Sequence, residues 1–225
     1  MEIQKKYHIS IGSNIGNRIK NIQETIDLIH SRIASLLSIS SIYETESIGF
    51  EGDDFFNICA SFNSFKSPHF IMNEFLEIEK LLGRVRSKEK KYTSRIIDID
   101  ILLVDDMIIN SEELTIPHKE MCNRRFVLDP LIEIDPNIIH PVNKMSIKEI
   151  LNSLESKQKI QNKEIILQNP AHSVSINNYS YIAIEGNIGS GKTSLSKLIS
   201  SDFNTKLMLE RFIDNPFLAK FYKNP

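Results

Sequence analysis

The chain has 225 residues, enough for one large domain or for one domain and part of another. It is 41% hydrophobic and 25% charged, and its net charge of −2 gives no general argument for binding nucleic acid or a membrane. Its two cysteines cannot form a disulfide framework, and we find neither a signal pattern nor an apolar run long enough to cross a bilayer. We therefore expect a soluble, cytoplasmic protein without nucleic-acid or membrane partners.

The first third of the chain predicts one strand, an amphipathic helix and then two further strands. Residues 8–11 predict a strand that ends in a glycine-containing turn, where Asn17 is placed to cap the next helix. Isoleucines then recur at helical spacing to about residue 37. Residues 38–46 and 55–62 predict two further strands, with a polar loop between them.

The order of the following elements predicts the fold class. Pro68 opens a second helix over about residues 69–82, and Gly83 ends it. A strand follows over residues 95–104, and residues 145–154 favour a closing helix. The order β-α-β-β-α-β is that of the ferredoxin-like arrangement, an α+β fold in which helices cover one face of an antiparallel sheet.

The strand over residues 95–104 is the part of the chain that points most directly to chemistry. It is rich in Ile, Leu and Val, which fits a largely buried strand. Asp98 and Asp100 are two residues apart and therefore project from the same face. Two adjacent carboxylates in apolar surroundings require a counter-charge, and Mg²⁺ is typically held by one or two carboxylates plus substrate phosphates. The pair predicts a Mg²⁺ site, although a charged strand edge is the simpler interpretation of these residues alone.

A basic segment lies just before these aspartates. Its cations are Arg84, Arg86, Lys88, Lys90, Lys91 and Arg95, with Glu89 as the one acidic residue among them. Arginine forks grip phosphate oxygens, so the segment and the aspartates together predict a phosphoryl-transfer site, whereas the segment alone also fits a solvated loop. His118 follows a proline and borders two more arginines, but a lone histidine is more often structural.

The end of the chain predicts a second unit. Residues 155–180 are polar and indicate a linker between a first domain at 1–154 and a piece at 181–225. An apolar strand is expected at residues 181–185. It directly precedes Gly186-Asn187-Ile188-Gly189-Ser190-Gly191-Lys192-Thr193, which satisfies G-x-x-x-x-G-K-[ST] and is followed by a helical pattern. In that context the loop from Gly186 to Gly191 cradles phosphates, Lys192 reaches the outer ones, and Thr193 helps bind Mg²⁺.

Residues 7–154 resemble hydroxymethyldihydropterin pyrophosphokinase, the folate-pathway enzyme that moves a diphosphate from ATP to 6-hydroxymethyl-7,8-dihydropterin. The matching segments, in order, are Gly12-Ser13-Asn14, Tyr43-Glu44-Thr45, Phe55-Phe56-Asn57, Gly83-Arg84-Val85-Arg86, Arg95-Ile96-Ile97-Asp98-Ile99-Asp100-Ile101-Leu102, Pro117-His118 and Arg124-Arg125-Phe126-Val127-Leu128. The resemblance implies that the chain takes ATP as co-substrate, acts on small molecules and uses Mg²⁺, with two ions bridging ATP and the pterin.

The resemblance also implies a role for each candidate site residue. The catalytic set is Asp98, Asp100, Arg84 and Arg95, with both aspartates as the metal ligands. The implied ATP contacts are Arg84, Arg86, Lys91, Tyr92, Arg95, His118 and Arg124. The implied pterin contacts are Thr45, Ile48, Phe55, Asn57 and Phe126, where the two rings sandwich the pterin. Glu79 matches a carboxylate that orders the arginine-bearing loop.

The chain departs from the family pattern at a few of these positions. The family usually has Arg-Trp-Gly-Pro-Arg where this chain has Lys91-Tyr92-Thr93-Ser94-Arg95, so Lys91 lacks the bidentate fork of arginine. Phe55 stands where tyrosine is frequent, and Glu46 stands where proline is common. These departures leave the detailed ATP contacts of residues 87–94 open, but not the reaction.

Residues 181–225 resemble the start of a deoxynucleoside kinase. The resemblance rests on the phosphate-loop stretch, on Glu210 at the position of that family's catalytic carboxylate, and on Asn215-Pro216-Phe217-Leu218. About 45 residues cannot bury a core of their own, so we expect a truncated, poorly ordered domain with a non-functional P-loop. The alternative is a bifunctional fusion that phosphorylates deoxynucleosides, and a third hypothesis is a nucleotide-binding remnant without enzyme activity.

Overall fold

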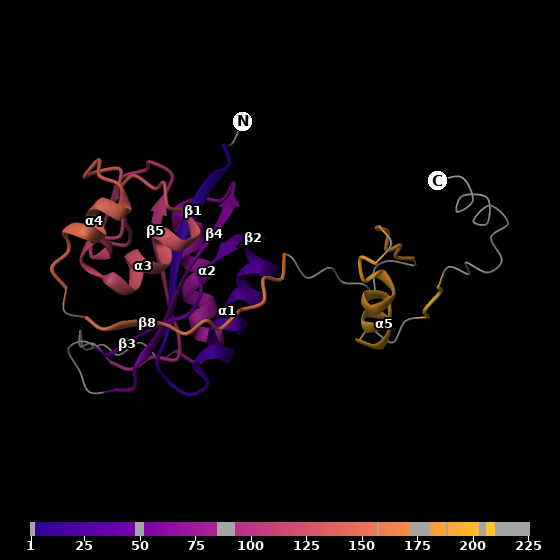
Figure 1. Ribbon diagram of the computed structural model, residues 1–225. Helices are drawn as coiled ribbons and strands as arrows, with labels where there is room; N and C mark the ends of the chain where they lie inside the picture. Colours follow the sequence, from indigo (N-terminus) through magenta and orange to yellow (C-terminus); the bar gives the residue numbers. More distant parts are fainter. Residues whose placement is uncertain are drawn as a thin grey trace. The chain divides into compact units, whose positions relative to one another are not determined.

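The computed structural model describes residues 3–47, 52–84, 93–156, 158–171, 181–187, 189–202 and 206–209. The chain divides into two compact units, Met1–Ser173 and Val174–Pro225. The first unit is built around a six-stranded antiparallel sheet with helices on both faces (Figure 1).

The sheet of the first unit contains β1 (Lys5–Ser13), β2 (Leu36–Ile39), β3 (Tyr43–Thr45), β4 (Phe55–Ser64), β5 (Asp98–Val104) and β8 (Ile160–Asn162). Their order across the sheet is β5-β1-β4-β3-β8, and β2 also pairs with β4. The strand β1 lies between β5 and β4, and its Gly12 is opposite Asn57 of β4 and opposite Asp98 of β5. This register brings the ends of three strands together at one edge of the unit.

Two helices, α1 (Arg18–Arg32) and α2 (Pro68–Leu81), cover one face of this sheet (Figure 1). The predicted cap of α1 is confirmed, since the Asn17 side chain accepts the Lys20 backbone N–H at 3.0 Å. The predicted end of α2 is also confirmed: Gly83 follows the helix with φ of +92°, a conformation that suits glycine. Isoleucines at helical spacing on both helices face the sheet and are fully buried, as at Ile26 and Ile78.

The main core lies between these helices and the sheet. Its buried side chains alternate along β1, β4 and β5 and repeat along the helices; they include Tyr7, Ile9, Ile11, Ile22, Ile29, Ile58, Phe62, Ile71, Phe75, Ile99 and Ile101. Each large apolar side chain buried in this way contributes roughly 1.5–3 kcal/mol of transfer free energy. This layer fixes one face of β1, β4 and β5 and leaves the residues between the apolar ones pointing to the opposite face.

The opposite face of the sheet is also covered, by α3 (Arg125–Ile134) and α4 (Ile147–Ser153), which differs from the prediction of helices on one face only (Figure 1). A second core of Cys59, Leu102, Leu128 and Leu131 joins α3 to the sheet. The helix α3 is absent from the predicted elements, because Pro130 within it removes a backbone donor and indicates a helix break. The helix α4 confirms the predicted closing helix.

Small elements connect these layers. A separate two-stranded sheet joins β6 (Ile109–Asn110) to β7 (Thr115–Ile116), and a 3₁₀ turn, η1 (Met121–Asn123), leads into α3. The predicted single strand over residues 38–46 is two strands, β2 and β3, because the intervening residues leave the ladder. The first helix ends at Arg32 rather than near residue 37, since Leu36 is buried in β2.

The predicted linker over residues 155–180 is wrong in its first half. Residues 160–162 form β8, which pairs with β3 so that Ile160 lies opposite Thr45. Beyond the strand, Ile165 and Leu167 pack against the main core. These contacts involve backbone pairing and two isolated apolar residues, and neither gives the periodic pattern by which a strand is found in a sequence.

The second unit contains α5 (Lys192–Asp202), which begins at the lysine of the P-loop motif. The expected strand at residues 181–185 is not formed, and within the described part of this unit no strand is present to pair with it. A strand needs such a partner for its backbone groups. None of the helices that the structure describes has both the length and the apolar character needed to span a bilayer.

Candidate functional site

A cavity of about 330 Å³ opens at the edge of the sheet on the face that carries α3. Eight residues predicted for the site line it: Thr45, Phe55, Asn57, Arg95, Asp98, Asp100, Arg124 and Phe126. They come from β3, β4, β5, the segment before β5 and the start of α3, so segments distant in sequence meet in one place. Its volume lies at the lower end of the range for small-molecule sites.

The two aspartates project from β5 into this cavity. Asp98 and Asp100 are half-buried and lie on the same face of the strand, whereas Ile99 and Ile101 are buried in the main core on the other face. Burial, followed by the nearby charge of Asp98, raises the pKa of the Asp100 carboxyl to about 7, while Arg124 works in the opposite direction. The ionised form of Asp100 is therefore disfavoured by its burial beside a second carboxylate, and a nearby cation would stabilise it.

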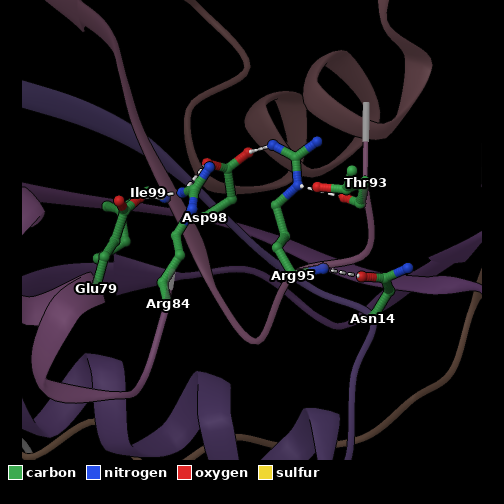
Figure 2. Close-up of polar contacts among 7 residues, drawn as sticks. All are labelled: Asn14, Glu79, Arg84, Thr93, Arg95, Asp98 and Ile99. Carbon is green, nitrogen blue, oxygen red and sulfur yellow. Dashed lines mark hydrogen bonds and ion pairs between the residues drawn. The ribbon is translucent and has the colours of Figure 1, made fainter. Parts of the chain in front are cut away.

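Two arginines bind the first of these aspartates, and a glutamate binds one of the two arginines (Figure 2). Nη1 of Arg84 donates to Oδ1 of Asp98 and to Oε1 of Glu79, and Nη1 of Arg95 donates to Oδ2 of Asp98 at 2.6 Å. Burial works against the charge of Arg84, but Asp98 and Glu79 outweigh it and raise the pKa of its guanidinium. Arg84 does not line the cavity itself; it lies behind Asp98.

The position of Arg95 is fixed through its backbone by Asn14, which follows β1 (Figure 2). The Asn14 side-chain oxygen accepts the Arg95 N–H at 2.7 Å, and the Asn14 N–H donates to the Arg95 carbonyl at 3.1 Å. The Asn14 amide nitrogen also donates to the Ser94 hydroxyl at 3.0 Å. The buried Asn14 thus holds the segment before β5 against the end of β1. These hydrogen bonds explain how a polar side chain can be buried at position 14.

The other half of the cavity combines rings with a hydrogen-bonded pair. Phe55 and Phe126 line the cavity, with the Arg95 guanidinium 5.8 Å from the centre of the Phe55 ring and that of Arg124 5.6 Å from the Phe126 ring. The Asn57 side-chain N–H donates to the Thr45 hydroxyl at 2.9 Å, which leaves the Asn57 carbonyl oxygen and the Thr45 hydroxyl proton for other partners.

Gly12 provides room on the floor of the cavity. A side-chain carbon at this position would lie 3.0 Å from Oδ1 of Asn57 and 3.7 Å from the Phe55 ring. The first of these distances is closer than side chains normally pack, so glycine keeps the Asn57 oxygen accessible. Because Gly12 lies two positions from Ser10 on the same face of β1, strand alternation is the signal by which both could have been assigned to the site.

His118 lies beside the cavity rather than in its lining. Its backbone N–H donates to the Leu102 carbonyl at 2.9 Å, and its Nδ1 accepts the Glu120 N–H at 3.3 Å. Burial, together with the charge of Arg124, lowers the pKa of the His118 imidazole to about 4. The histidine is therefore neutral at physiological pH, with Nε2 carrying the proton as a hydrogen-bond donor.

Several predicted site residues lie outside the residues that the structure describes: Ile48, Arg86, Lys91 and Tyr92. Conversely, six residues without a predicted site role line the cavity: Ser10, Gly12, Glu46, Glu120, Asn123 and Gln158. Glu120 lies two residues after His118, and Asn123 immediately precedes Arg124, so their nearness to these two motifs is a sequence signal that they belong to the site. Gln158 has no such motif near it.

The model of the 7,8-dihydro-6-hydroxymethylpterin-pyrophosphokinase (HPPK) family matches residues 8–136 of this chain. The chain belongs to this family. Its resemblance to the family over the sequence blocks described above is thereby confirmed. In the HPPK fold of this chain, the matched region runs from β1 to the residues just after α3.

Curated relatives agree with the family match. The chain is 35% identical over 144 residues to the 2-amino-4-hydroxy-6-hydroxymethyldihydropteridine pyrophosphokinase of Aquifex aeolicus, covering 63% of this chain and 88% of that protein. It is 39% identical over 141 residues to the folic acid synthesis protein fol1 of Pneumocystis carinii, covering 62% of this chain but 19% of that protein. The chain thus spans about a fifth of the fungal relatives that it matches.

A solved structure shares the HPPK fold at low sequence identity. The wild-type HPPK-DHPS of Plasmodium falciparum, crystallised with SDX-DHP, aligns with a TM-score of 0.56 and 15% identity over 67% of this chain and 44% of that one. This likeness supports a mixed α and β fold with an antiparallel sheet.

The C-terminal unit matches a different family, deoxynucleoside kinase, over residues 182–225. Within its P-loop motif, Gly189 and Gly191 have φ of +82°, and the Lys192 side chain donates to the Gly186 and Asn187 carbonyls, the latter at 2.8 Å. Lys192 thus folds back onto its own loop. Glu210 and residues 215–218, on which the sequence resemblance also rested, lie outside the described residues.

Proposed function

We propose that the chain transfers the terminal diphosphate of ATP to the hydroxymethyl group of 6-hydroxymethyl-7,8-dihydropterin, a step of folate synthesis. The observation that carries this proposal is the composition of one cavity, which is lined by two adjacent carboxylates and arginines together with two phenyl rings and a hydrogen-bonded polar pair. The charged residues suit a triphosphate with Mg²⁺, and the rings and the polar pair suit a flat, polar heterocycle. The bacterial relatives, each named as a 2-amino-4-hydroxy-6-hydroxymethyldihydropteridine pyrophosphokinase, support this choice of reaction.

The pterin is proposed to lie between Phe55 and Phe126. Stacking on two rings buries both faces of a planar heterocycle, and the free Asn57 oxygen and Thr45 hydroxyl proton then recognise groups on its edge. Ile48 completes the proposed set, although it lies outside the described residues. Such a site would reject ligands that leave the buried polar pair without partners.

The phosphates of ATP are proposed to bind Arg84, Arg95, His118 and Arg124, with Arg86, Lys91 and Tyr92 from outside the described residues. Arg84 and Arg95 now bind the single carboxylate of Asp98. A triphosphate carries more negative charge than one carboxylate, so both arginines gain stronger partners when ATP arrives. Their departure would free both oxygens of Asp98 to bind a cation.

The donor set of Asp98 and Asp100 fits Mg²⁺, and we propose that these two residues hold two ions. The fit rests on two oxygen ligands from one strand face and on the burial of Asp100 beside Asp98, which together raise the pKa of the Asp100 carboxyl. In the described part of the chain no third acidic, histidine or cysteine side chain joins them, which leaves coordination positions for phosphate and water. When bound, Mg²⁺ neutralises phosphate charge and activates the hydroxyl oxygen.

The remaining contribution of the protein is to position the two substrates. Because the transferred group is a diphosphate, the hydroxyl oxygen forms a bond to the β-phosphorus, the bond to the oxygen bridging to the α-phosphorus breaks, AMP leaves and the hydroxyl proton passes to water. The ring pair orients the hydroxyl, and the arginines stabilise charge that develops on the phosphate oxygens. Most of the proposed catalysis comes from holding the attacking hydroxyl oxygen in line with the phosphorus–oxygen bond that breaks.

We further propose that this site is built on a ferredoxin-like βαββαβ unit. The support is that β1 pairs antiparallel with both β5 and β4, while β4 also pairs with β2 and β3, which together stand for one strand of that arrangement. Three of these strands deliver Gly12, Asn57 and Asp98 to neighbouring positions. The unit therefore sets the spacing between the proposed pterin contacts and the proposed metal ligands.

The test uses Asp98→Asn and Asp100→Asn, with AMP and pterin diphosphate measured as products. Each variant should lose about 100-fold or more in rate, because it removes metal ligation while its shape is preserved. The control is Asp106→Asn in the exposed turn after β5, which should retain wild-type activity. Near-normal transfer by either site variant at millimolar Mg²⁺ would refute the metal assignment.

A further inference from the structure

Gln158 lines the cavity but lies beyond the residues that match the HPPK family model. It belongs to the segment that enters β8, on the side of the cavity that carries Thr45 and Phe55. The side-chain nitrogen Nε2 of Gln158 is buried, and among the described residues it has no hydrogen-bond partner. It is thus a buried donor at the wall of the proposed pterin site.

The position of Gln158 is fixed by pairing rather than by the side chain itself. Two residues later Ile160 enters β8 opposite Thr45, and Lys163 then binds Glu44 of β3 at 2.9 Å. The Lys163 N–H also donates to the Ile42 carbonyl at 2.9 Å, and the Gln158 N–H donates to the Ser156 hydroxyl at 3.2 Å. These contacts on both sides hold the backbone of Gln158 next to the cavity.

An unpaired buried N–H is costly, since losing its bond to water without replacement costs on the order of 1–3 kcal/mol. Most buried polar groups in proteins are paired for this reason. Nearby, the Asn57 and Thr45 side chains already bind each other and do not supply an acceptor to Gln158. A molecule bound in the cavity can supply the missing acceptor, because Gln158 lines that cavity.

We propose that Gln158 is a pterin-binding residue whose amide N–H donates to an acceptor atom, a ring nitrogen or a carbonyl oxygen, on the edge of the bound pterin. This inference rests on the proposed function, because it takes the pterin as the occupant of the cavity. It adds a contact from a segment after the matched domain to the contacts of Thr45 and Asn57. Gln158 thereby makes the segment before β8 part of the wall of the substrate site.

The experiment replaces Gln158 by methionine in the full 225-residue chain. Methionine keeps the length of the side chain and removes the amide. The matched control is Gln161→Met, because Gln161 lies three residues later, in β8, with its side chain exposed. The dissociation constant of the pterin is measured with Mg²⁺ and an ATP analogue that carries a methylene bridge between the α- and β-phosphorus, and that of ATP is measured separately.

We expect Gln158→Met to raise the dissociation constant of the pterin about 3- to 10-fold, as the loss of one hydrogen bond predicts, with ATP affinity unchanged. Gln161→Met should match the wild type for both ligands. Gln158→Ala should weaken pterin binding at least as much as Gln158→Met. The unliganded Gln158→Met protein should melt at the wild-type temperature or above it, because an unpaired buried donor is removed. The rise in melting temperature on adding pterin should be smaller than in the wild type.

A structural role for Gln158 gives the reverse pattern, a lower melting temperature without ligand and an unchanged pterin dissociation constant. That result, or equal pterin affinity in both methionine variants, would overturn the inference while the wild type still makes pterin diphosphate. If the wild-type chain itself makes no pterin diphosphate, the proposed function fails, and the inference fails with it. The wild-type product assay therefore separates the two failures.

Discussion

Glu79 holds Arg84 against the strand that carries the site aspartates (Figure 2). One carboxylate oxygen of Glu79 accepts both Nη1 of Arg84 and, at 3.0 Å, the backbone N–H of Ile99 between Asp98 and Asp100. The Glu79 side chain is 2% exposed, so its charge is neutralised by Arg84 rather than by water. The end of α2 is thereby bonded to the centre of the site.

We predict that Glu79→Ala destabilises the protein by about 2–4 kcal/mol and weakens ATP binding. The change leaves the Ile99 N–H without its acceptor and removes one of the two carboxylates that hold Arg84. Urea unfolding and an ATP titration measure the two effects. Glu77→Ala on the same helix, with its side chain 58% exposed, should change the free energy of unfolding by less than about 0.5 kcal/mol. Similar stabilities of the two variants would contradict this role of Glu79.

A second prediction concerns the two rings of the cavity. Phe55→Ala and Phe126→Ala should each weaken pterin binding by about 1–3 kcal/mol, because stacking and its buried area are lost. The affinity for ATP should change much less. Calorimetric titration of both ligands measures the difference, with Phe65→Ala as the control, since Phe65 is 55% exposed and outside the cavity lining. Equal losses for both ligands would argue against a pterin between the rings.

The parts of this site that can be predicted from the sequence follow from rules that relate residues close together in the chain. The two-residue period of a strand predicts that Asp98 and Asp100 share a face, and the structure confirms this geometry. The caps at Asn17 and Gly83 follow from the chemistry of helix ends and are present as predicted. Such rules use neighbours within a few residues, which a sequence displays directly.

The parts that escape prediction depend on pairing across the chain. Asn14 accepts a hydrogen bond from Arg95, which is 81 residues away in the sequence. No motif near either residue predicts this contact. The strand β8 has only three residues, of which Ile160 alone is apolar, so it is too short to show the alternation that reveals a strand. The sequence therefore predicts a linker at Gln158, although the pairing of β8 brings this residue to the cavity.

A third prediction follows from the lowered pKa of His118. The folded-state pKa is about 4, below the ordinary value of 6.5, so between these values the unfolded chain binds a proton that the folded protein does not. The contribution of this histidine to stability is full above pH 6.5 and is lost as pH falls towards 4. Urea unfolding at several pH values should therefore show a smaller loss of stability for His118→Gln than for the wild type. The matched control is His69→Gln on the exposed surface of α2, and an unchanged pH profile for His118→Gln would contradict the prediction.

The last prediction concerns the P-loop unit, which we expect to be silent in the pterin reaction. The residues before the loop form no strand, Leu195 and Leu198 of α5 are 49% and 59% exposed, and Lys192 binds its own loop rather than pointing to a ligand. A phosphate cradle requires its strand and helix to be held by neighbours. Deleting the chain from Asn177 onward, or introducing Lys192→Ala, should therefore leave diphosphate transfer to the pterin essentially unchanged. The full 225-residue chain should show no phosphorylation of deoxynucleosides.

A shorter truncation provides the contrast for this prediction. Ending the chain after residue 154 also removes β8 and Gln158, together with the packing of Ile165 and Leu167 on the main core. It should lower both the melting temperature and pterin affinity, whereas the truncation at Asn177 should lower neither. Product analysis with ATP and each candidate substrate separates the two activities. A nucleoside monophosphate made by the full chain and lost in Lys192→Ala would show that the P-loop unit is a working kinase, because only an assembled phosphate cradle depends on that lysine.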